Sequence, residues 1–482
     1  MANNISRSSI VNSLVWKFLE RIFSQGMNLF VQIILARLLL PKDFGSLALI
    51  VAITNYAAIF VQSGLATTIV QRKNLHKGDV STLLTSSLVV AGALYVSIYV
   101  LSPWISSIYK LPELVWPLRI LALVLFLNGY NSVQTALLQR EMKFKALFWR
   151  SMLAVPISGT VGIVMAYTGF GLWALVAQNI INMAVTVIVM YIGSDYPLKF
   201  GFNWTRARNL YSFGGKILLT SLVTGFGDTF RTLLIGKKYD ANELAYYNKG
   251  NAYSNYITQI VNATLQSVML PAFAKNQDDI EVIRSYMRKS LGVTAFVMFP
   301  ILFGVIATAK PLVLLFLTAK WAPATPFLMI YCFLRLPSSL TVLDKQVFYA
   351  LGKSHIGLYY EIGLLIANIA ILLLTMEFSV MAMAVGITVV EYIGCVVIYF
   401  VADRVYHYRL SDRIKDIWKP LLNSMLMFFA MKSIDILNLS DLSVLLLQLC
   451  VGLICYILGA IILRDENIKY LISVVKAKHF PF

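Results

Sequence analysis

Six of the basic side chains inside apolar stretches of the sequence are candidates for ligand binding, because a charge is costly there unless water or a polar group accompanies it. They are Arg21, Arg119, Arg231, Lys249, Arg335 and Lys345. An arginine guanidinium can hold two phosphate oxygens at once, and a lysine ammonium supplies a compact positive charge. The set therefore indicates a cationic cavity for an anionic substrate that carries phosphate.

Acidic and amide side chains interrupt the same apolar stretches. They are Glu20, Asn28, Asn128, Asn131, Asp228, Asp344, Glu361 and Glu391. Amides suit sugar hydroxyls or hydrogen bonds between helices, and acids suit ion coupling or pairing with a base. We expect these residues to line the polar part of the cavity or to take part in coupling. The alternative is structural pairing, for example of Asp228 with Arg231, which are three residues apart on one helix.

Motifs of other chemistries are missing from the sequence. There is no glycine-rich phosphate loop, no HExxH and no GxSxG, so we expect no enzyme. The four cysteines lie in apolar runs without CxxC spacing, which predicts no disulfide framework, metal or cofactor. A net charge of +18 would suggest nucleic acid in a soluble protein. In an apolar chain it is better explained by basic cytoplasmic loops and by contact with anionic membrane lipids.

The amino-acid composition indicates which kind of secondary structure holds these residues. Of the 482 residues 59% are hydrophobic and only 13% are charged, whereas soluble domains are ~45–50% apolar and ~25% charged. This excludes a soluble multidomain enzyme and a disordered chain. Because a spanning helix needs ~20 apolar residues, the sequence predicts an all-α, polytopic membrane protein with about 14 transmembrane helices. The predicted windows are 14–36, 44–66, 80–101, 115–138, 146–167, 171–192, 213–236, 244–270, 290–309, 324–350, 355–375, 380–402, 419–436 and 442–463.

Two details of this segmentation carry further predictions. The apolar stretch 311–317 either extends the ninth helix or lies in the membrane interface. If the N-terminus is cytoplasmic, 26 Lys and Arg fall in cytoplasmic loops and 8 on the other side. Since basic residues stay inside, both termini are expected in the cytoplasm. The start lacks a cleavable signal, so the first helix is expected to remain as an anchor.

A weak internal repeat appears when the chain is shifted by 200 residues. The matched pairs include Phe30 with Phe230, Arg37 with Lys237, Asp43 with Glu243, and Asn55-Tyr56 with Asn255-Tyr256. Chance similarity between apolar helices is the alternative. A real repeat would give two pseudo-symmetric six-helix bundles of equal orientation, at 1–200 and 201–403, with the substrate site between them. Residues 404–482 would add a basic loop, two extra helices and a cytoplasmic tail.

Several motifs resemble those of the Wzx-type polysaccharide flippases of the multidrug/oligosaccharidyl-lipid/polysaccharide exporter superfamily. They are LARLLLPKDFGSLAL, SGLATTIVQRKNL, LLQREMKFKALFWRS and TGFGLWALV. The resemblance implies two six-helix bundles in a V shape, a central cationic cavity and alternating access. It also implies an undecaprenyl-diphosphate-linked oligosaccharide as substrate, moved across a bacterial inner membrane, with a polysaccharide polymerase as a candidate partner. No residue role transfers with it.

Two alternatives remain open from the sequence. A drug or cation antiporter of the same superfamily would favour buried carboxylates in the N-terminal half, and the second to sixth windows contain essentially none. A membrane glycosyltransferase or polymerase would need a sizeable outer loop, and every predicted outer loop is short. Both features favour the flippase.

Overall fold

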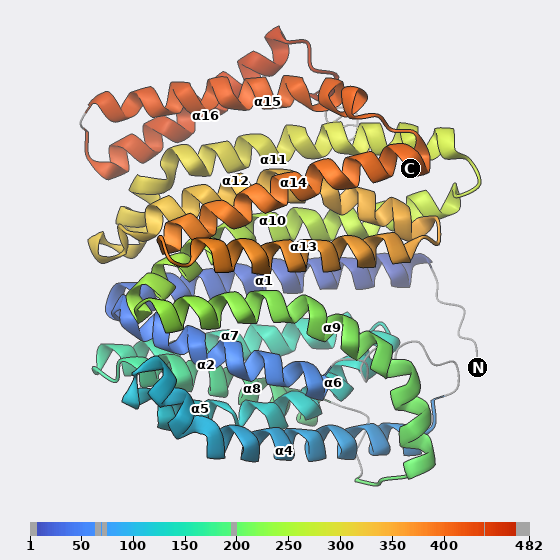
Figure 1. Cartoon of the computed structure of the whole chain (residues 1–482), viewed down its shortest axis with the longest axis vertical. Coiled ribbons are helices and arrows are strands. Elements are labelled where there is room, and N and C mark those ends of the chain that lie inside the picture. The colour runs from blue at the N-terminus through green and yellow to red at the C-terminus, as the bar shows by residue number, and fades with distance from the viewer. Residues whose placement is uncertain (1–6, 63–68, 70–74, 194–199, 438, 469–482) are drawn as a thin grey trace. The chain divides into compact units, whose positions relative to one another are not determined.

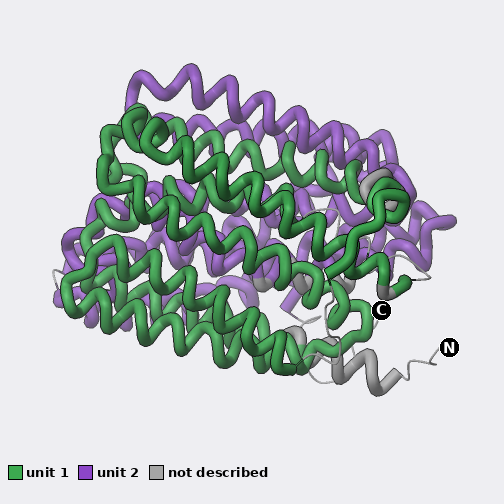
Figure 2. The backbone as a smooth tube through the Cα atoms, turned by 90° about the horizontal axis from the view of Figure 1, so that it is seen from below, with its two compact units in different colours: residues 1–245 green, residues 246–482 purple. Residues whose placement is uncertain are grey.

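The computed structural model describes residues 7–62, 69, 75–193, 200–437 and 439–468, and every regular element in those ranges is a helix (Figure 1). The chain divides into two compact units, residues 1–245 and 246–482 (Figure 2). Each unit has its own packed helices and its own buried apolar side chains.

The described residues of the first unit form nine helical segments and the start of the long helix α10. Its helices are α1 (Arg7–Leu38), α2 (Pro41–Gln62), α4 (Lys77–Tyr109), the 3₁₀ turn η1 (Pro112–Leu114), α5 (Val115–Leu121), α6 (Val124–Arg140), α7 (Phe144–Tyr167), α8 (Leu172–Ile192) and α9 (Trp204–Lys238). Helix α10 (Ala241–Lys275) begins here and continues in the second unit.

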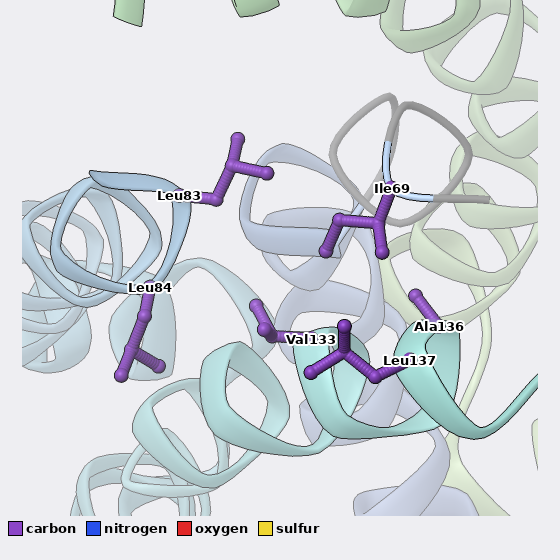
Figure 3. Close-up of a cluster of buried hydrophobic side chains, with 6 residues drawn as sticks. All are labelled: Ile69, Leu83, Leu84, Val133, Ala136 and Leu137. Atoms are coloured by element: carbon purple, nitrogen blue, oxygen red, sulfur yellow. The ribbon is translucent and has the colours of Figure 1, made fainter. Parts of the chain in front are cut away.

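Close helix contacts hold the first unit together. Helix α7 packs on α1 and α8, and α9 packs on α2 and α4. A Cβ atom on Gly236 would lie 2.4 Å from Leu49 Cδ2, so a larger residue there would force the Leu49 side chain between α9 and α2 to shift. At one end of α4 and α6 a buried apolar cluster encloses Ile69 (Figure 3). Arg140 Nη1 donates to the Ile69 carbonyl at 2.6 Å and ties this residue to α6.

The second unit contains the remaining helices. They are α11 (Ile280–Leu317), the 3₁₀ turn η2 (Ala319–Trp321), α12 (Ala324–Ala350), α13 (Ser354–Thr375), α14 (Val380–Tyr406), α15 (Leu410–Lys432), the 3₁₀ turn η3 (Ser433–Leu437) and α16 (Asp441–Ile462). Helix α11 packs on α12 and α15, and α14 packs on α12 and α13. Helices α15 and α16 lie side by side against α11 (Figure 1). Capping side chains set several helix starts: Asp279 accepts from the backbone N–H groups of Glu281 and Val282.

The prediction of an all-helical polytopic membrane protein is confirmed. Among the described residues, 11 helices are long and apolar enough to cross a membrane. The other three predicted windows lie on α1, α9 and α10, whose interiors carry charges and amides. Every predicted window therefore overlaps at least one described helix, and spanning by α1, α9 and α10 stays a prediction.

Two boundaries differ from those that we expected. The stretch 311–317 extends the preceding helix, because α11 continues through Pro300 and Pro311 to Leu317. The basic loop expected at the start of 404–482 is reduced to residues 407–409, because the charged segment before Trp418 already belongs to α15. In this segment the charges alternate with apolar residues at helical spacing, which is typical of an amphipathic helix and not of a loop.

The compact units do not coincide with the predicted six-helix halves. They divide at residue 245 and not at 200, because α9 packs on α2 and α4. The helix boundaries nevertheless keep the predicted offset of 200 at one turn: α1 ends at Leu38 and α2 begins at Pro41, while α9 ends at Lys238 and α10 begins at Ala241. The symmetry of the two halves stays a prediction.

Candidate functional site

Four of the predicted site residues come together in the second unit, on three neighbouring helices. Arg335 and Lys345 belong to α12, Glu361 to α13 and Glu391 to α14. Lys345 Nζ donates to Glu361 Oε1 at 2.8 Å, and Arg335 Nη2 donates to Asn251 Oδ1 on α10 at 2.8 Å. Glu391 lies within the electrostatic influence of Lys345 and Arg335. These five residues, Asn251 included, are called the α12 cluster below.

The α12 cluster surrounds an irregularity in α12. Pro337 has no backbone N–H, so the carbonyl of Phe333, four residues earlier, lacks its usual helical donor. The hydroxyl of Tyr392 on α14 donates to that carbonyl at 3.2 Å. Tyr392 follows Glu391 directly. One turn of α14 therefore supplies a carboxylate to the cluster and a hydrogen-bond donor to the Phe333 carbonyl of α12.

The Lys345–Glu361 pair is accessible enough to change partners. Its side chains are 22% and 36% exposed, respectively, and the Tyr360 ring lies 5.8 Å from Lys345 Nζ. An ion pair of this kind stabilises the fold only modestly, since water competes for both charges. An incoming anion could therefore replace the Glu361 carboxylate beside Lys345.

Asp344, the residue before Lys345, faces a different environment. Its carboxylate receives two hydrogen bonds from Arg413 on α15, at 3.1 and 2.6 Å, and one from the Tyr406 hydroxyl. Both members of this ion pair are 0% exposed. Asp344 is thus closed off from solvent, which differs from the cavity position that we expected, and it ties α12 to α14 and α15.

Lys249 also lies in the second unit and is buried. Its Nζ lies 5.5 Å from the centre of the Trp321 ring and 5.8 Å from that of Tyr253. Aromatic faces attract a cation, which offsets part of the cost of burying the ammonium group. The position of Lys249 between two rings therefore favours a structural contribution to the contact between α10 and η2.

Arg119, in the first unit, is held by the end of α4. Its Nε donates to Ser102 Oγ at 2.8 Å, and its guanidinium lies 4.0 Å from the centre of the Tyr99 ring. Arg231 on α9 forms the ion pair with Asp228 that their spacing predicts. The Asp228 side chain is 80% exposed, whereas that of Arg231 is 16% exposed. Both bases thus have partners within their own unit.

A second polar cluster in the first unit joins α1, α6 and α7. Ser151 Oγ donates to Glu20 Oε1 at 2.9 Å. Arg150 Nη1 donates to Thr135 Oγ1 at 3.1 Å and to Asn131 Oδ1 at 3.4 Å. Arg150 lies inside α7 and within the predicted window 146–167, but it was not among the predicted site residues.

The remaining predicted site residues lie apart from these clusters. Arg21 and Asn28 are half-buried on α1, and Asn128 is buried on α6. Within the described ranges, none of the three forms a hydrogen bond or ion pair with another predicted site residue. In the same ranges no group of three or more His, Cys, Asp or Glu side chains could hold a metal ion.

The comparison with known families and curated proteins gives consistent matches. A family model described as polysaccharide biosynthesis protein matches residues 34–326. The chain is 25% identical to the succinoglycan biosynthesis transport protein ExoT of Rhizobium meliloti, covering 68% of this chain and 66% of that protein. It is 24% identical to the lipopolysaccharide biosynthesis protein WzxC of Escherichia coli, covering 87% and 86%, respectively.

Solved structures share the fold at lower sequence identity. An inward closed conformation of the lipid II flippase MurJ matches with a TM-score of 0.78 and 15% identity, over 94% of this chain and 99% of that one. An inward-facing multidrug resistance transporter of the MATE family, in the MOP superfamily, matches with a TM-score of 0.62 and 16% identity, over 79% and 94%.

Proposed function

We propose a function for this chain from the premise that it belongs to the polysaccharide biosynthesis protein family, within the multidrug/oligosaccharidyl-lipid/polysaccharide exporter superfamily. As a member of that family it is a multi-pass membrane transporter of polysaccharide biosynthesis and not an enzyme. We propose that its cargo is an undecaprenyl-diphosphate-linked oligosaccharide, the repeat unit of a surface polysaccharide. The protein moves this lipid by alternating access from the cytoplasmic to the periplasmic leaflet of a bacterial inner membrane.

The α12 cluster is the observation that supports a phosphate-bearing cargo. Two phosphates cannot cross ~30 Å of hydrocarbon bare, because burying an unpaired charge is very costly. Arg335 and Lys345 offer two cations on one apolar helix, and both are held by neutral or anionic partners when no cargo is bound. In the proposed cycle the diphosphate takes the place of Glu361 beside Lys345 and accepts hydrogen bonds from the Arg335 fork.

The remaining acids of the cluster then have a defined part in the cycle. When the diphosphate occupies Lys345, the Glu361 carboxylate loses its cationic partner, and Glu391 lies close enough to repel it. Uptake of a proton or a metal cation by this pair would relieve the repulsion. Cargo binding and cation binding would therefore favour each other in this unit.

The antiporter alternative finds less support in the structure. Among the described residues of α2 to α8, the acids Asp43, Asp79 and Glu113 lie at helix starts, and Glu141 directly follows α6. Asp79 is moreover paired with Arg206 at 3.1 Å. A buried carboxylate in mid-helix is not among them, and Glu20 on α1, outside this range, accepts a hydrogen bond from Ser151.

The cargo can be tested in cells of the source bacterium that lack the chain. We expect lipid-linked oligosaccharide to accumulate on the cytoplasmic leaflet, shown by its resistance to a glycosidase added to intact spheroplasts, and to become accessible when the gene is restored. Sensitivity of the same cells to cationic drugs is measured beside it. Unchanged lipid-linked oligosaccharide together with increased drug sensitivity would contradict the flippase and support the antiporter.

A further inference from the structure

A second cationic site lies in the second unit, away from the α12 cluster. A cavity of about 540 Å³ opens where α11 begins, α14 ends and α15 begins. Four of the residues that line it are arginines: Arg284, Arg288, Arg404 and Arg409. Its carboxylates are Asp403 and Asp412. Glu281 and Asp416 pair with Arg284 and Arg288, and Lys415 pairs with Asp412. The five basic groups thus exceed the four acidic groups by one positive charge, which a bound anion would neutralise.

The cavity is called the arginine pocket below, and part of its wall is the turn between α14 and α15. His407 has φ 55°, in the left-handed region that favours glycine, so the turn is held by its surroundings. Tyr406 and Tyr408 are buried, whereas Arg404, His407 and Arg409 are exposed. The Tyr408 hydroxyl donates to Asp416 Oδ2 at 2.6 Å, and burial raises the pKa of Tyr408, so that it stays protonated. Alternate residues thus anchor the turn and face the cavity.

The four arginines differ in their partners. Arg288 donates from Nε and Nη2 to the two oxygens of Asp416, each at 2.8 Å. Arg284 donates from Nη2 to Glu281 Oε2 at 2.6 Å. Arg404 and Arg409, in contrast, form no ion pair with any acid that the structure describes. These two side chains are therefore the ones with guanidinium groups available to a ligand.

The place of the pocket indicates the class of ligand. Residues 407–409 join two helices that can cross the membrane, so the turn lies at a membrane surface. Ile414 and Trp418 lie further along α15 and are exposed, at 54% and 44%, and tryptophan favours the depth of lipid headgroups. Basic pockets between membrane helices are suited to anionic headgroups.

We propose that the arginine pocket binds the phosphate of an anionic phospholipid headgroup, with Arg404 and Arg409 as its main donors. The recognised group is a phosphate, which a lipid headgroup and a soluble phosphate ion have in common. The adjoining cavity of about 620 Å³ shares Arg284 and Arg288, which are paired with acids, but is lined by neither Arg404 nor Arg409, so it is not part of the site.

Native mass spectrometry of the delipidated full-length protein in detergent tests the site. It is titrated with phosphatidylglycerol, with phosphatidylcholine and with inorganic phosphate in separate series. We expect tight binding of phosphatidylglycerol alone. The double variant R404Q/R409Q should bind that lipid about 30-fold more weakly, as expected for two basic residues at an anionic membrane surface. Each single variant should show a smaller loss, and R404K/R409K should retain part of the binding.

The matched control is K275Q/K353Q, which removes two exposed basic residues of the same unit outside the pocket. We expect it to bind phosphatidylglycerol like the wild type. Equal binding by R404Q/R409Q and the wild type would overturn the site, and so would equal losses in the pocket and control variants. If inorganic phosphate binds the wild type as tightly as the lipid and the pocket variant loses both, the site belongs to the free ion and the headgroup assignment is wrong. Gel filtration verifies folding, and the single variants decide if the double variant does not fold.

Discussion

Asp344 and Arg413 form an ion pair in which neither side chain reaches solvent, although they lie 69 positions apart on α12 and α15. Removing one partner of such a pair leaves the other charge buried, which costs roughly 3–5 kcal/mol. We therefore expect D344A to lower the thermal unfolding temperature and the membrane abundance of the protein.

Replacing both partners shows whether the loss of stability in D344A comes from the unpaired charge of Arg413. The double variant D344L/R413M keeps the volume without the charges, and we expect it to recover most of the stability that D344A loses. Thermal unfolding of the purified proteins in detergent measures this difference. If D344A unfolds at the wild-type temperature, Asp344 is not confined as the structure places it.

The hydrogen bond from Tyr392 to the Phe333 carbonyl gives a second prediction. Y392F removes the donor and should destabilise the protein by about 1 kcal/mol, because the carbonyl beside Pro337 is left without a partner. In a P337A background the new backbone N–H can serve Phe333, so the same substitution should cost much less. Y359F, at an exposed tyrosine, is the control. Equal effects of Y392F in both backgrounds would contradict this interpretation.

The topology prediction follows from the distribution of basic loops. Reporter fusions after Lys145 and Arg208 should indicate the cytoplasm, and fusions after Lys42 and Lys238 the periplasm. The last two positions adjoin the two short turns that the predicted repeat relates: Lys42 lies at the start of α2, and Lys238 ends α9. A single clear inversion among these four fusions would be incompatible with the predicted spans.

The exposed pair of Asp228 and Arg231 allows a prediction on α9. Because the Asp228 side chain is largely exposed, the pair should contribute about 0–1 kcal/mol to stability. We expect R231A to reach the membrane in normal amounts and to lose glycan export, with R231K recovering part of it. Export and abundance are measured in the same cells. Recovery of export in D228A/R231A would instead show that Arg231 serves only to neutralise Asp228.

Much of the fold could be predicted from local pattern, because apolar windows report where a helix forms whatever it packs against. The turn between α1 and α2 and its counterpart 200 residues later were visible in this way. Contacts between residues far apart in the sequence could not be predicted in this way. Arg413 lies in a charged segment that resembles a loop, and only the packing of α15 on α11 and α14 shows that it is buried against Asp344.

The sequence could predict which residues belong to the candidate site but not which of them lie close together. Charge inside an apolar window identified Arg335, Lys345, Glu361 and Glu391, because such residues are rare in membranes. The sequence could not show that Asp344 and Lys345, which are adjacent, face different helices. It also could not show that Tyr392 repairs the irregularity at Pro337, since that contact depends on the register between α12 and α14.

The central claim is that Arg335 and Lys345 carry the phosphates of the cargo. The most direct measurement is the rate at which a fluorescent undecaprenyl-diphosphate-linked oligosaccharide crosses proteoliposome membranes that contain equal amounts of wild type, R335A, R335K or K345A. K275A, at an exposed site, is the matched control. We expect R335A and K345A to be at least about tenfold slower, because each loses a charge-assisted hydrogen bond, with R335K intermediate and K275A unchanged. Wild-type rates for R335A and K345A would contradict it.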